Sequence, residues 1–558
     1  MPGIYDSLEV GKKALLAQQA VLNTVGHNLA NVATPGYTRQ RADLTPVVEQ
    51  GGVNVTGITR IRDRYLDFSL MTESQTLAQD QAQESLMQRL QSIFNDPTTR
   101  GLGAMVNQLF QGFQDVSANP TDQALRATLA DDGNRLSGTM QGLWSRADQL
   151  KSDLATQINV QVAKANGLVS QIAEIHRQIQ ASGGGQPPQD LYDKRDALID
   201  QLNQIIGVSA TDRPDGTVQL AVKGTGVLLV DGTLTSTLTA TPTVATDSID
   251  LSAGSVGVTP QGGQLAAAVN ARNSPNGPIK QAQSALDSLA RSIMTEVNRL
   301  HTSGAGLTGY STIISGNAVT GAGVALSAAG LPFTPGSGSF TVAVHDATGA
   351  TTSSVTVPVT AGATTLNDVA TALNADPDLS ATVSGGTLTL SVGGGKSFVF
   401  ANDTSDTLLA LGLNTFFAGS GARDMSLDPT IAADPSKIAA AQPDASGLVH
   451  PGDGANALAM AGLATALTMR GGTSTFADFY GALVGNVGSQ MRDASDAVTR
   501  QQAAVQVVQS LQQQTSSVST DEELISLTQA QTAYAAAAKF LGTTQNIIQT
   551  LLDMVVIQ

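Results

Sequence analysis

Cysteine is absent from the 558-residue sequence. Its absence excludes disulfide bonds, metal sites with cysteine ligands and catalysis by a thiol. Aromatic residues are also scarce, at 4% of the chain, so the hydrophobic cores must be built mainly from Leu, Val, Ile and Ala. No apolar run approaches the roughly 20 residues that a membrane-spanning helix needs, so we expect no membrane insertion. The first six residues have neither the basic segment nor the apolar block of a cleaved signal peptide, and none is expected.

Charged residues are few, at 14% of the chain, and acidic residues outnumber basic ones by 46 to 30, which gives a formal net charge of −16. A protein that binds nucleic acid needs clustered Lys and Arg to contact the phosphates. The basic residues here are scattered. The nearest approach to a patch is Arg60, Arg62 and Arg64, which we interpret as the solvated entrance of a helix. We therefore expect no nucleic-acid partner.

Residues that could carry catalysis or hold a metal are dispersed. The five histidines form no HExxH motif, and we expect each to be an ordinary core or surface residue: His27, His176, His301, His345 and His450. The segment 393–397 resembles the end of a phosphate-binding loop, but Leu390 stands where that motif needs Gly, and strand-like residues 398–400 follow where it needs a helix. A hairpin turn is the better interpretation. We expect no catalytic residues, no metal site, no cofactor and no enzymatic activity.

Both ends of the chain carry a seven-residue apolar repeat, which puts one stripe on one face of a helix. The N-terminal row is Leu8, Leu15, Leu22 and Leu29, and the C-terminal row is Leu527, Tyr534, Leu541, Ile548 and Val555. A second C-terminal row consists of Leu524, Gln531, Ala538, Gln545 and Leu552. The two ends could pair within one molecule or assemble between molecules. Because Ala and Gln occupy many of these positions and bury little apolar surface, assembly among many copies is favoured.

The helical pattern stops and restarts at recognisable signals. It covers about 5–33, ends at Thr34-Pro35-Gly36, and resumes from Arg64 to about 181 with breaks at Asp96-Pro97 and Asn119-Pro120. Within it we predict one apolar stripe on a long helix, formed by Leu150, Leu154, Ile158, Val162, Ala165, Val169, Ile172 and Ile179. The C-terminal helix should begin with a capping box between Thr520 and Glu523. Strand-like alternation replaces the helical pattern at 208–258, with turn signals at Asp215-Gly216 and Asp231-Gly232, and strand-like segments recur within 303–443.

These patterns predict a mainly α fold with β inserts. We expect an elongated, multi-domain protein with coiled-coil-like paired N- and C-terminal helices, a central helical bundle and small inserted β-rich domains. The expected division is a terminal helical assembly domain (1–60 plus 515–558), a helical bundle (61–206, 262–310 and 444–514), a small β-rich insert (207–261) and an outer β-rich insert (311–443).

The terminal segments resemble the axial proteins of the bacterial flagellum, which are the rod, hook and hook-associated proteins. The N-terminal likeness is carried by Ser7-Leu8, Ala14-Leu15, Ala17-Gln18-Gln19, Leu22, Asn28-Leu29-Ala30-Asn31 and Thr34-Pro35-Gly36-Tyr37. The C-terminal likeness is carried by Asp521-Glu522-Glu523, Leu527, Gln529, Gln531, Tyr534, Ala536, Ala537 and Leu551-Leu552. The string Thr38-Arg39-Gln40 is similar to the hook-associated branch.

The likeness extends inward through Asn119–Leu129, Leu191–Asp196, Gly262–Leu265 and Val297–His301. It departs from the family pattern at residues 516–520 and at Arg272-Asn273.

This resemblance implies a structural subunit that self-assembles at the distal end of the hook, forms the junction with the filament and allows the filament to attach. The implied partners are identical subunits in a ring, hook protein below, a second hook-associated junction protein and the filament above, and a flagellar export chaperone. The implied location is the extracellular flagellum, reached through flagellar type III export. The residues implied in self-assembly are Leu8, Leu15, Leu22, Leu29, Asn28, Asn31, Pro35, Gly36, Tyr37, Leu527, Tyr534, Leu541, Ile548 and Leu552.

Two alternatives remain open at this point. A hook or rod axial subunit would share the terminal helices, although the long helical segment 64–206 argues against it. A surface adhesin or glycan-binding protein would use the insert at about 311–440, which is rich in Thr, Ser and Gly but short of the aromatic residues that stack on sugars.

Overall fold

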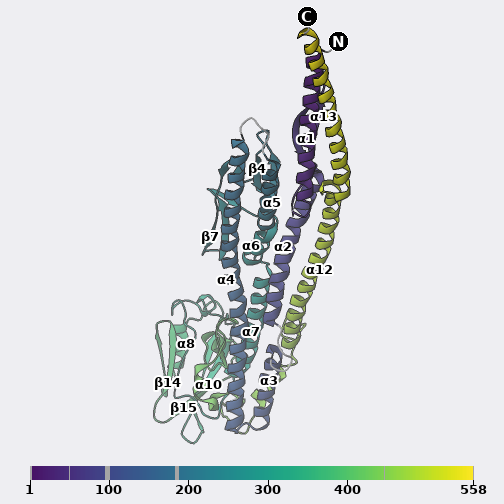
Figure 1. Cartoon of the computed structure of the whole chain (residues 1–558). Coiled ribbons are helices and arrows are strands. Elements are labelled where there is room, and N and C mark those ends of the chain that lie inside the picture. Colours follow the sequence, from purple (N-terminus) through teal and green to yellow (C-terminus); the bar gives the residue numbers. More distant parts are fainter. Residues whose placement is uncertain are drawn as a thin grey trace. The chain divides into compact units, whose positions relative to one another are not determined.

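The computed structural model describes residues 3–34, 36–48, 51–94, 101–182, 188–444 and 446–556. These residues form long helices with small antiparallel sheets between them, as Figure 1 shows, so the predicted class of mainly α with β inserts is confirmed. The chain divides into two compact units. The terminal unit comprises Met1–Leu86, Asp153–Ser274 and Arg492–Gln558, and the insert unit comprises Met87–Ser152 and Pro275–Met491.

The terminal unit contains both ends of the chain. Its helices are α1 (Ile4–Ala30), α5 (Gln189–Ile205), α6 (Gly263–Asn273) and α13 (Thr520–Val556), together with parts of α2 (Arg64–Phe94), α4 (Gln123–Ala181) and α12 (Phe476–Ser516). The hairpin of β1 (Gln40–Pro46) and β2 (Val53–Arg60) also belongs to it. Within this unit α1 and α13 lie side by side in antiparallel directions, with the N- and C-termini at the same end of the pair (Figure 1).

The helix ends largely follow the predicted signals. Helix α1 ends at Ala30, and a turn follows at residues 31–34; Pro35 of the predicted stop lies outside the described residues. Gly36 has a φ of +77°, a left-handed conformation that favours glycine. The break at Asn119-Pro120 separates α3 (Leu102–Ala118) from α4, whereas Asp96-Pro97 falls outside the described residues.

The apolar stripe predicted along α4 is buried as expected. Every predicted member is in the core: Leu150, Leu154, Ile158, Val162, Ala165, Val169, Ile172 and Ile179. Steps of three, four and seven residues place these side chains on one face of the helix, and most of the polar residues between them face water, apart from the buried Gln161 and His176.

Two small sheets follow α5 in the terminal unit. One has the order β3-β4-β5-β6, with strands Val208–Asp212, Val218–Val222, Leu228–Asp231 and Leu234–Thr235. The other has the order β7-β8-β9, with strands Leu238–Thr243, Ser248–Ala253 and Val256–Val258. Val218, Leu220 and Val222 are buried in alternation, as period-two patterning predicts. The predicted turns at Gly216 and Gly232 both have positive φ.

The insert unit holds α3 and α7 (Pro278–Thr302) and most of the remaining strands and short helices. One sheet has the order β12-β11-β15, with strands Thr351–Val359, Gly338–His345 and Ser397–Ala401. Another has the order β10-β14-β13, with strands Thr312–Ile314, Thr387–Val392 and Leu379–Ser384. The smaller elements are β16 (Phe417–Ala418), β17 (Ser426–Leu427), α8 (Leu366–Leu373), α9 (Thr407–Leu411), α10 (Pro429–Ala433), α11 (Ala455–Gly462) and 3₁₀ turns at Leu326–Ala328 and Pro435–Lys437.

The glycine-rich segment at 393–397 is a turn, but the prediction of a hairpin there is wrong. Lys396 donates its backbone N–H to the Gly393 carbonyl, which closes a tight turn. The flanking strands β14 and β15 belong to different sheets, because β15 pairs with β11 instead of folding back on β14. On β15, which pairs with β11, Phe398 contacts both Tyr310 and Phe400 through its ring.

None of the helices, searched over the described residues, has the long apolar window that crossing a bilayer needs.

Candidate assembly site: the terminal helix pair and its polar junction

The seam between α1 and α13 combines fully buried small side chains with half-buried leucine and isoleucine. On α13 the residues turned inward recur in steps of four and three, with one step of seven where Tyr534 is exposed: Glu523, Leu527, Ala530, Ala537, Leu541, Thr544 and Ile548 are buried or half-buried. On α1 Ala17, Thr24, Val25 and Asn28 are buried, and the predicted Leu8, Leu15, Leu22 and Leu29 are half-buried. Alternating three- and four-residue steps are the pattern of a coiled-coil seam.

The two predicted rows on α13 have different positions. Leu527, Leu541 and Ile548 of the first row line the seam, whereas Tyr534 is exposed. The second predicted row does not complete the seam, since Leu524 and Leu552 are both exposed. The row that does so contains Glu523, Ala530, Ala537 and Thr544.

Gly11 lies at a close contact between the two helices. A Cβ atom placed on Gly11 would lie 3.0 Å from Leu541 Cδ1 and 3.2 Å from Phe540 Cδ1. Glycine therefore lets the backbone of α1 approach the side chains of α13. This contact also fixes the alignment of the pair, because Gly11 is level with Leu541 while Asn28 is level with Glu523.

At the base of the pair lies a group that we call the polar junction: Asn28, Tyr37, Arg39, Gln40 and Glu523. Asn28 is only 1% exposed, and its side-chain amide is fully used. Its Nδ2 donates to the Gln40 carbonyl (2.9 Å) and to Glu523 Oε2 (3.1 Å). Its Oδ1 accepts from the Gln40 N–H (2.9 Å) and the Tyr37 hydroxyl (2.8 Å). One buried amide thus joins α1, the start of β1 and α13.

Glu523 is the buried charge of the junction, at 2% exposed. Arg39 Nε donates to Glu523 Oε1 over 2.7 Å, while Arg39 Nη1 donates to the exposed Glu522 over 2.7 Å. The Arg39 backbone N–H also donates to the carbonyl of Ser516, the last residue of α12, and so holds the end of that helix at the junction. The predicted capping box is wrong: α13 begins at Thr520, and the Glu523 carboxylate is engaged by Arg39 and Asn28 in charge-assisted and buried hydrogen bonds.

Tyr37 stays a neutral donor in this site. Burial, together with the nearby Asp190, Asp193 and Glu523, raises the pKa of the Tyr37 hydroxyl well above its ordinary value. His27 Nδ1 lies 3.0 Å from the same hydroxyl, and its Nε2 lies 3.5 Å from Asp190 on α5. A pocket of about 360 Å³ between α1, the β1–β2 hairpin and the start of α5 borders this group.

The other two predicted residues of this region shape the turn after α1. Asn31 donates its side-chain amide to the His27 carbonyl over 2.9 Å and accepts from Thr34 Oγ1, so it satisfies the end of the helix. Gly36 supplies the left-handed turn that brings Tyr37 back toward Asn28. The structure therefore brings Asn28 and Tyr37 into the junction and leaves Asn31 and Gly36 in supporting positions.

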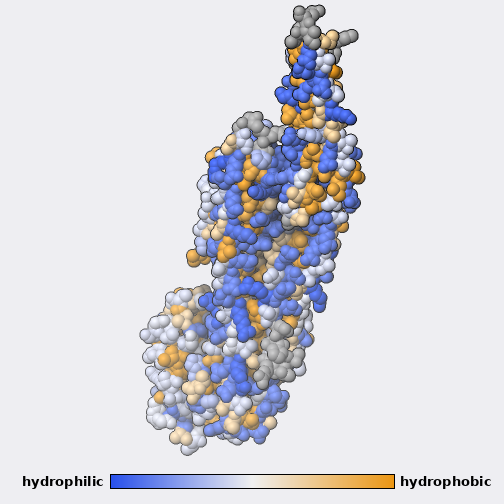
Figure 2. Space-filling model, in the orientation of Figure 1, coloured by the Kyte–Doolittle hydropathy of each residue, from blue (hydrophilic) through white to orange (hydrophobic). Residues whose placement is uncertain are grey.

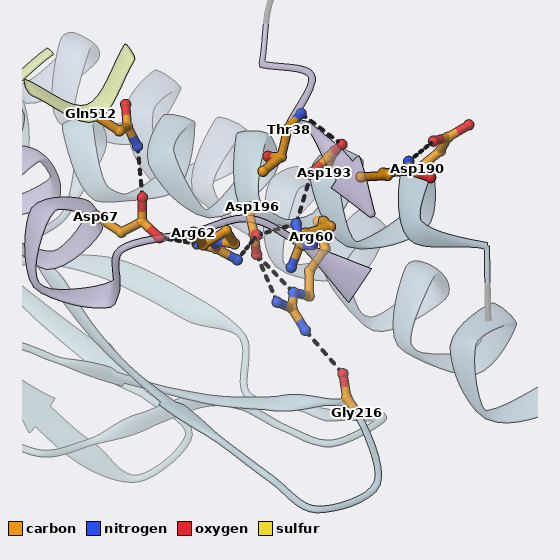
Figure 3. Close-up of polar contacts among 11 residues, drawn as sticks. Thr38, Arg60, Arg62, Asp67, Asp190, Asp193, Asp196, Gly216 and Gln512 are labelled. Carbon is orange, nitrogen blue, oxygen red and sulfur yellow. Dashed lines mark hydrogen bonds and ion pairs between the residues drawn. The ribbon is translucent and has the colours of Figure 1, made fainter. Parts of the chain in front are cut away.

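A second charged group lies beside the junction, and we call it the arginine–aspartate cluster (Figure 3). Arg60 Nη1 donates to Asp193 (2.7 Å) and to Asp196 (2.9 Å). Arg62 donates to the same Asp196 and to Asp67, whose other oxygen accepts from Gln512 of α12. The hairpin, α5, α2 and α12 are thereby joined by charged side chains.

Asp196 is the centre of this cluster. Burial alone would raise the pKa of Asp196, but Arg195, Arg62 and Arg60 outweigh that effect and hold it below its ordinary value. The interpretation of Arg60 and Arg62 as a solvated helix entrance is therefore wrong, because aspartates that are more than 130 residues away in sequence neutralise and largely cover them. Only Arg64 of the three is well exposed, at 83%.

The sequence reasoning missed Arg39, Asp193 and Asp196 as site residues. Glu523 was noted as a helix-capping residue and as part of the C-terminal family likeness, but not as a site residue. A usable signal existed, since acidic residues at 193 and 196 lie on one face of a helix and Arg60 and Arg62 alternate to one face of a strand end. What the sequence does not give is the pairing of these two faces.

Family models match three parts of the chain. Residues 87–313 match the model described as "Flagellar hook-associated protein FlgK helical domain". Residues 8–38 match "Flagella basal body rod protein", and residues 502–554 match "Flagellar basal body rod FlgEFG protein C-terminal". The last two matches cover most of α1 and α13 respectively.

Curated relatives carry one common name. Flagellar hook-associated protein 1 of Salmonella typhimurium is 26% identical over 569 residues, which cover 97% of this chain and 98% of that protein. The protein of the same name from Escherichia coli is 26% identical over 578 residues, with the same coverage. That of Bacillus subtilis is 29% identical over 237 residues, or 40% of this chain and 47% of that protein.

A solved structure shares the fold. The flagellar hook junction protein FlgK of Burkholderia pseudomallei aligns with a TM-score of 0.54 at 18% identity, covering 82% of this chain and 100% of that one. With matches in both terminal helices and in the helical region between them, and with relatives aligned over nearly their full length, the chain is similar throughout to flagellar hook-associated protein 1.

Proposed function

We propose that this chain is a structural subunit of the bacterial flagellum, located at the junction between hook and filament. The near full-length alignment with relatives named for hook association supports this role. A non-enzymatic role agrees with a family whose members are named as parts of the flagellum. Its location would then be extracellular, on the flagellum.

We propose further that the subunits self-assemble through the terminal helices. The observation that carries this proposal is an apolar stripe on α13 that its own chain covers only in part. Its side chains are between 45% and 66% exposed: Phe540, Ile547, Leu551 and Met554. They recur in steps of seven, four and three, so they lie along one line of the helix. Figure 2 shows hydrophobic surface on the part of the molecule that contains α1 and α13.

The energetics favour neighbours for this pair. The fully buried positions of the internal seam are mostly Ala, Gly and Thr, which bury little apolar surface, and its leucines are only half-buried. Each large apolar side chain of the stripe is already about half covered, so burial of the rest would contribute roughly 1–1.5 kcal/mol, about half of the value for full burial. Further subunits would therefore cover more apolar surface than α1 covers alone. The half-buried leucines of α1 and the exposed Tyr534 and Leu552 would contribute to the same assembly.

The partners proposed from the family are identical subunits in a ring, hook protein on one side, and a second junction protein with the filament on the other. Export would use the flagellar type III route without a cleaved signal peptide. A chaperone is proposed to cover the exposed stripe before assembly, because an uncovered apolar stripe promotes aggregation.

A hook or rod subunit is less well supported. The two rod models match only the terminal segments 8–38 and 502–554, whereas the inner 87–313 matches the hook-associated model. An adhesin is not favoured by any observation: within the described part of 311–443 the exposed large apolar residues are Ile314 and Val324, neither of which is aromatic.

The test is a double substitution in the stripe, Ile547→Ser with Leu551→Ser, introduced into a motile host that lacks its own copy. Both side chains are exposed in the free chain, so the helix content of the purified protein should not change, while hooks should form without attached filaments. Gln545→Ser, at an exposed polar position of the same helix, is the matched control and should restore filaments. Normal filaments with the double variant would contradict assembly through this stripe.

A further inference from the structure

We propose that the polar junction sets the register of the terminal helix pair. Glu523, held by Arg39 and Asn28, would fix which residues of α13 lie opposite which residues of α1. This inference concerns the free chain and does not depend on where the subunit assembles.

The small side chains of the seam by themselves allow more than one register of α1 and α13. Its α13 side repeats Ala530, Ala537 and Thr544 every seven residues, and its α1 side offers Gly11, Ala17 and Thr24. Sliding one helix by seven residues moves it about 10.5 Å and presents the same face again. Small side chains would then meet small side chains as before, so apolar packing distinguishes the registers weakly.

Glu523 distinguishes the observed register from the shifted ones strongly. In the observed antiparallel alignment it is level with Asn28, while Leu541 is level with Gly11. A slide of one heptad in one direction would bring the carboxylate to the level of Val21 and Leu22, among apolar side chains. A slide in the other direction would carry it past the end of α1. Either slide separates the carboxylate from its two donors, and a buried charge without a partner is strongly disfavoured.

Asn28 and Arg39, the two residues that donate to the Glu523 carboxylate, are held in place by contacts that do not involve α13. Asn28 bonds both the N–H and the carbonyl of Gln40, which holds the first residue of β1 against the helix. Arg39 is adjacent in sequence, and its carbonyl accepts from the Ile61 N–H after β2. Arg39 and Asn28 therefore present a preformed site for one carboxylate at one height along α1.

The neighbouring Glu522 provides a matched comparison. It also accepts from Arg39 over 2.7 Å, but it is 62% exposed, so water can replace that bond. Only Glu523 must find its partner in the interior. The proposal therefore assigns the register to position 523 and not to position 522.

The experiment uses the absence of cysteine, since any introduced pair is unique. In the purified full-length chain, Gly11→Cys is combined with Leu541→Cys to report the observed register, or with Tyr534→Cys or Ile548→Cys to report a slide of one heptad. Each pair is oxidised at high dilution, and the disulfides are quantified by mass spectrometry. In the parent background the 11–541 disulfide should exceed the shifted ones on the order of a hundredfold.

Each pair is then measured with Glu523→Leu, Glu523→Gln or Glu522→Gln. Glu523→Leu should keep the helix content while the shifted disulfides rise to amounts comparable with the 11–541 disulfide, because leucine suits every heptad register. Glu522→Gln should keep the parent pattern. A role in stability alone would lower helix content without creating shifted disulfides.

The proposal is overturned if Glu523→Leu keeps the parent pattern, or if the parent chain already forms all three disulfides equally. Should Glu523→Leu lose its helix content, Glu523→Gln decides. This variant keeps a polar side chain of the same size but removes the charge, and it should also give shifted disulfides. The parent pattern in that variant would overturn the proposal.

Discussion

Asn28 Nδ2 donates a hydrogen bond to Glu523 Oε2 over 3.1 Å, joining two buried residues that are 495 positions apart in the sequence. The contact connects the last turns of α1 with the first turn of α13. Around it, Arg39 neutralises the carboxylate and Tyr37 occupies the remaining lone pair of the amide oxygen. Beyond this point the seam of the two helices consists mainly of small and apolar side chains, so most of the polar contacts that specify the pairing lie at its base.

Replacement of Asn28 by Leu should loosen this base. The change removes one donor to Glu523 and leaves the Tyr37 hydroxyl and the Gln40 N–H without their acceptor. Each buried polar group without a partner costs about 1–3 kcal/mol. Hydrogen exchange should therefore accelerate in the first turns of α13 and the last turns of α1. Asn31→Leu, at a half-buried position outside the junction, should have a smaller effect, and equal effects of the two changes would contradict the role of Asn28.

Gly11→Leu should destabilise the helix pair. A side chain at this position meets Leu541 and Phe540 at 3.0–3.2 Å from its Cβ, and overpacking of this kind typically costs about 1–3 kcal/mol. The comparison is Gly26→Leu in the same helix, where a Cβ would meet no other described atom within 4 Å. There the substitution should stabilise α1 by roughly 0.5–1 kcal/mol, since glycine is a poor helix former. Exchange rates of α1 amides would separate the two outcomes.

The insert unit should lose stability as the pH falls below about 6.5. His301 is fully buried, with Nδ1 donating to the Asn414 carbonyl (2.7 Å) and Nε2 accepting from the Ala439 N–H (2.9 Å). Burial lowers the pKa of His301 to about 4, the Asn414 bond opposes this shift, and Arg126 adds to it.

Because the folded pKa lies below the unfolded one, the unfolded chain binds the proton more readily. The stabilisation is therefore complete above about pH 6.5 and is lost progressively as the pH falls toward 4, by an amount on the order of 3 kcal/mol. Denaturant unfolding of the insert unit followed between pH 4 and 8 measures this slope. His301→Gln should flatten the slope, and an unchanged slope would assign it to other groups.

Asp196→Asn should be the most damaging single change in the arginine–aspartate cluster. Three arginines share this carboxylate, and its loss leaves largely buried positive charges with fewer partners. Breaking a buried ion pair costs about 3–5 kcal/mol. Asp212→Asn removes a carboxylate that pairs with the exposed Arg64 and should cost less than about 1 kcal/mol. Thermal unfolding of the terminal unit compares the two variants, and similar losses would count against a central role for Asp196.

Local patterns predicted much of the fold. The α4 stripe, the Asn119-Pro120 break and the turns at Gly216 and Gly232 depend on neighbours within a few residues, and the structure has all of them. The helical terminal segments followed from their heptads. The predictions that were wrong concerned contacts between residues that are distant in sequence.

The clearest example is the choice between Leu524 and Glu523. Hydrophobicity alone places Leu524 in the seam, yet Glu523 is buried and Leu524 is exposed. The reason is that Arg39 and Asn28, almost 500 residues earlier, supply the charge and hydrogen bonds that make burial of a carboxylate favourable. Arg60 and Arg62 were misinterpreted for the same reason, since their aspartate partners lie on another element. A capping-box pattern at Thr520 was likewise outcompeted by a distant partner.

The most direct measurement of assembly through the terminal helices is cross-linking within the assembled flagellum. Ile547→Cys provides one reactive group on the exposed stripe of a chain that otherwise has none, and Gln545→Cys provides a control on the polar part of the same helix. Hook structures carrying each variant are isolated and treated with a bifunctional thiol reagent. Assembly through the stripe predicts covalent multimers of this subunit from Ile547→Cys in clear excess over Gln545→Cys. Monomers alone from Ile547→Cys, in hooks that contain the subunit, would contradict it.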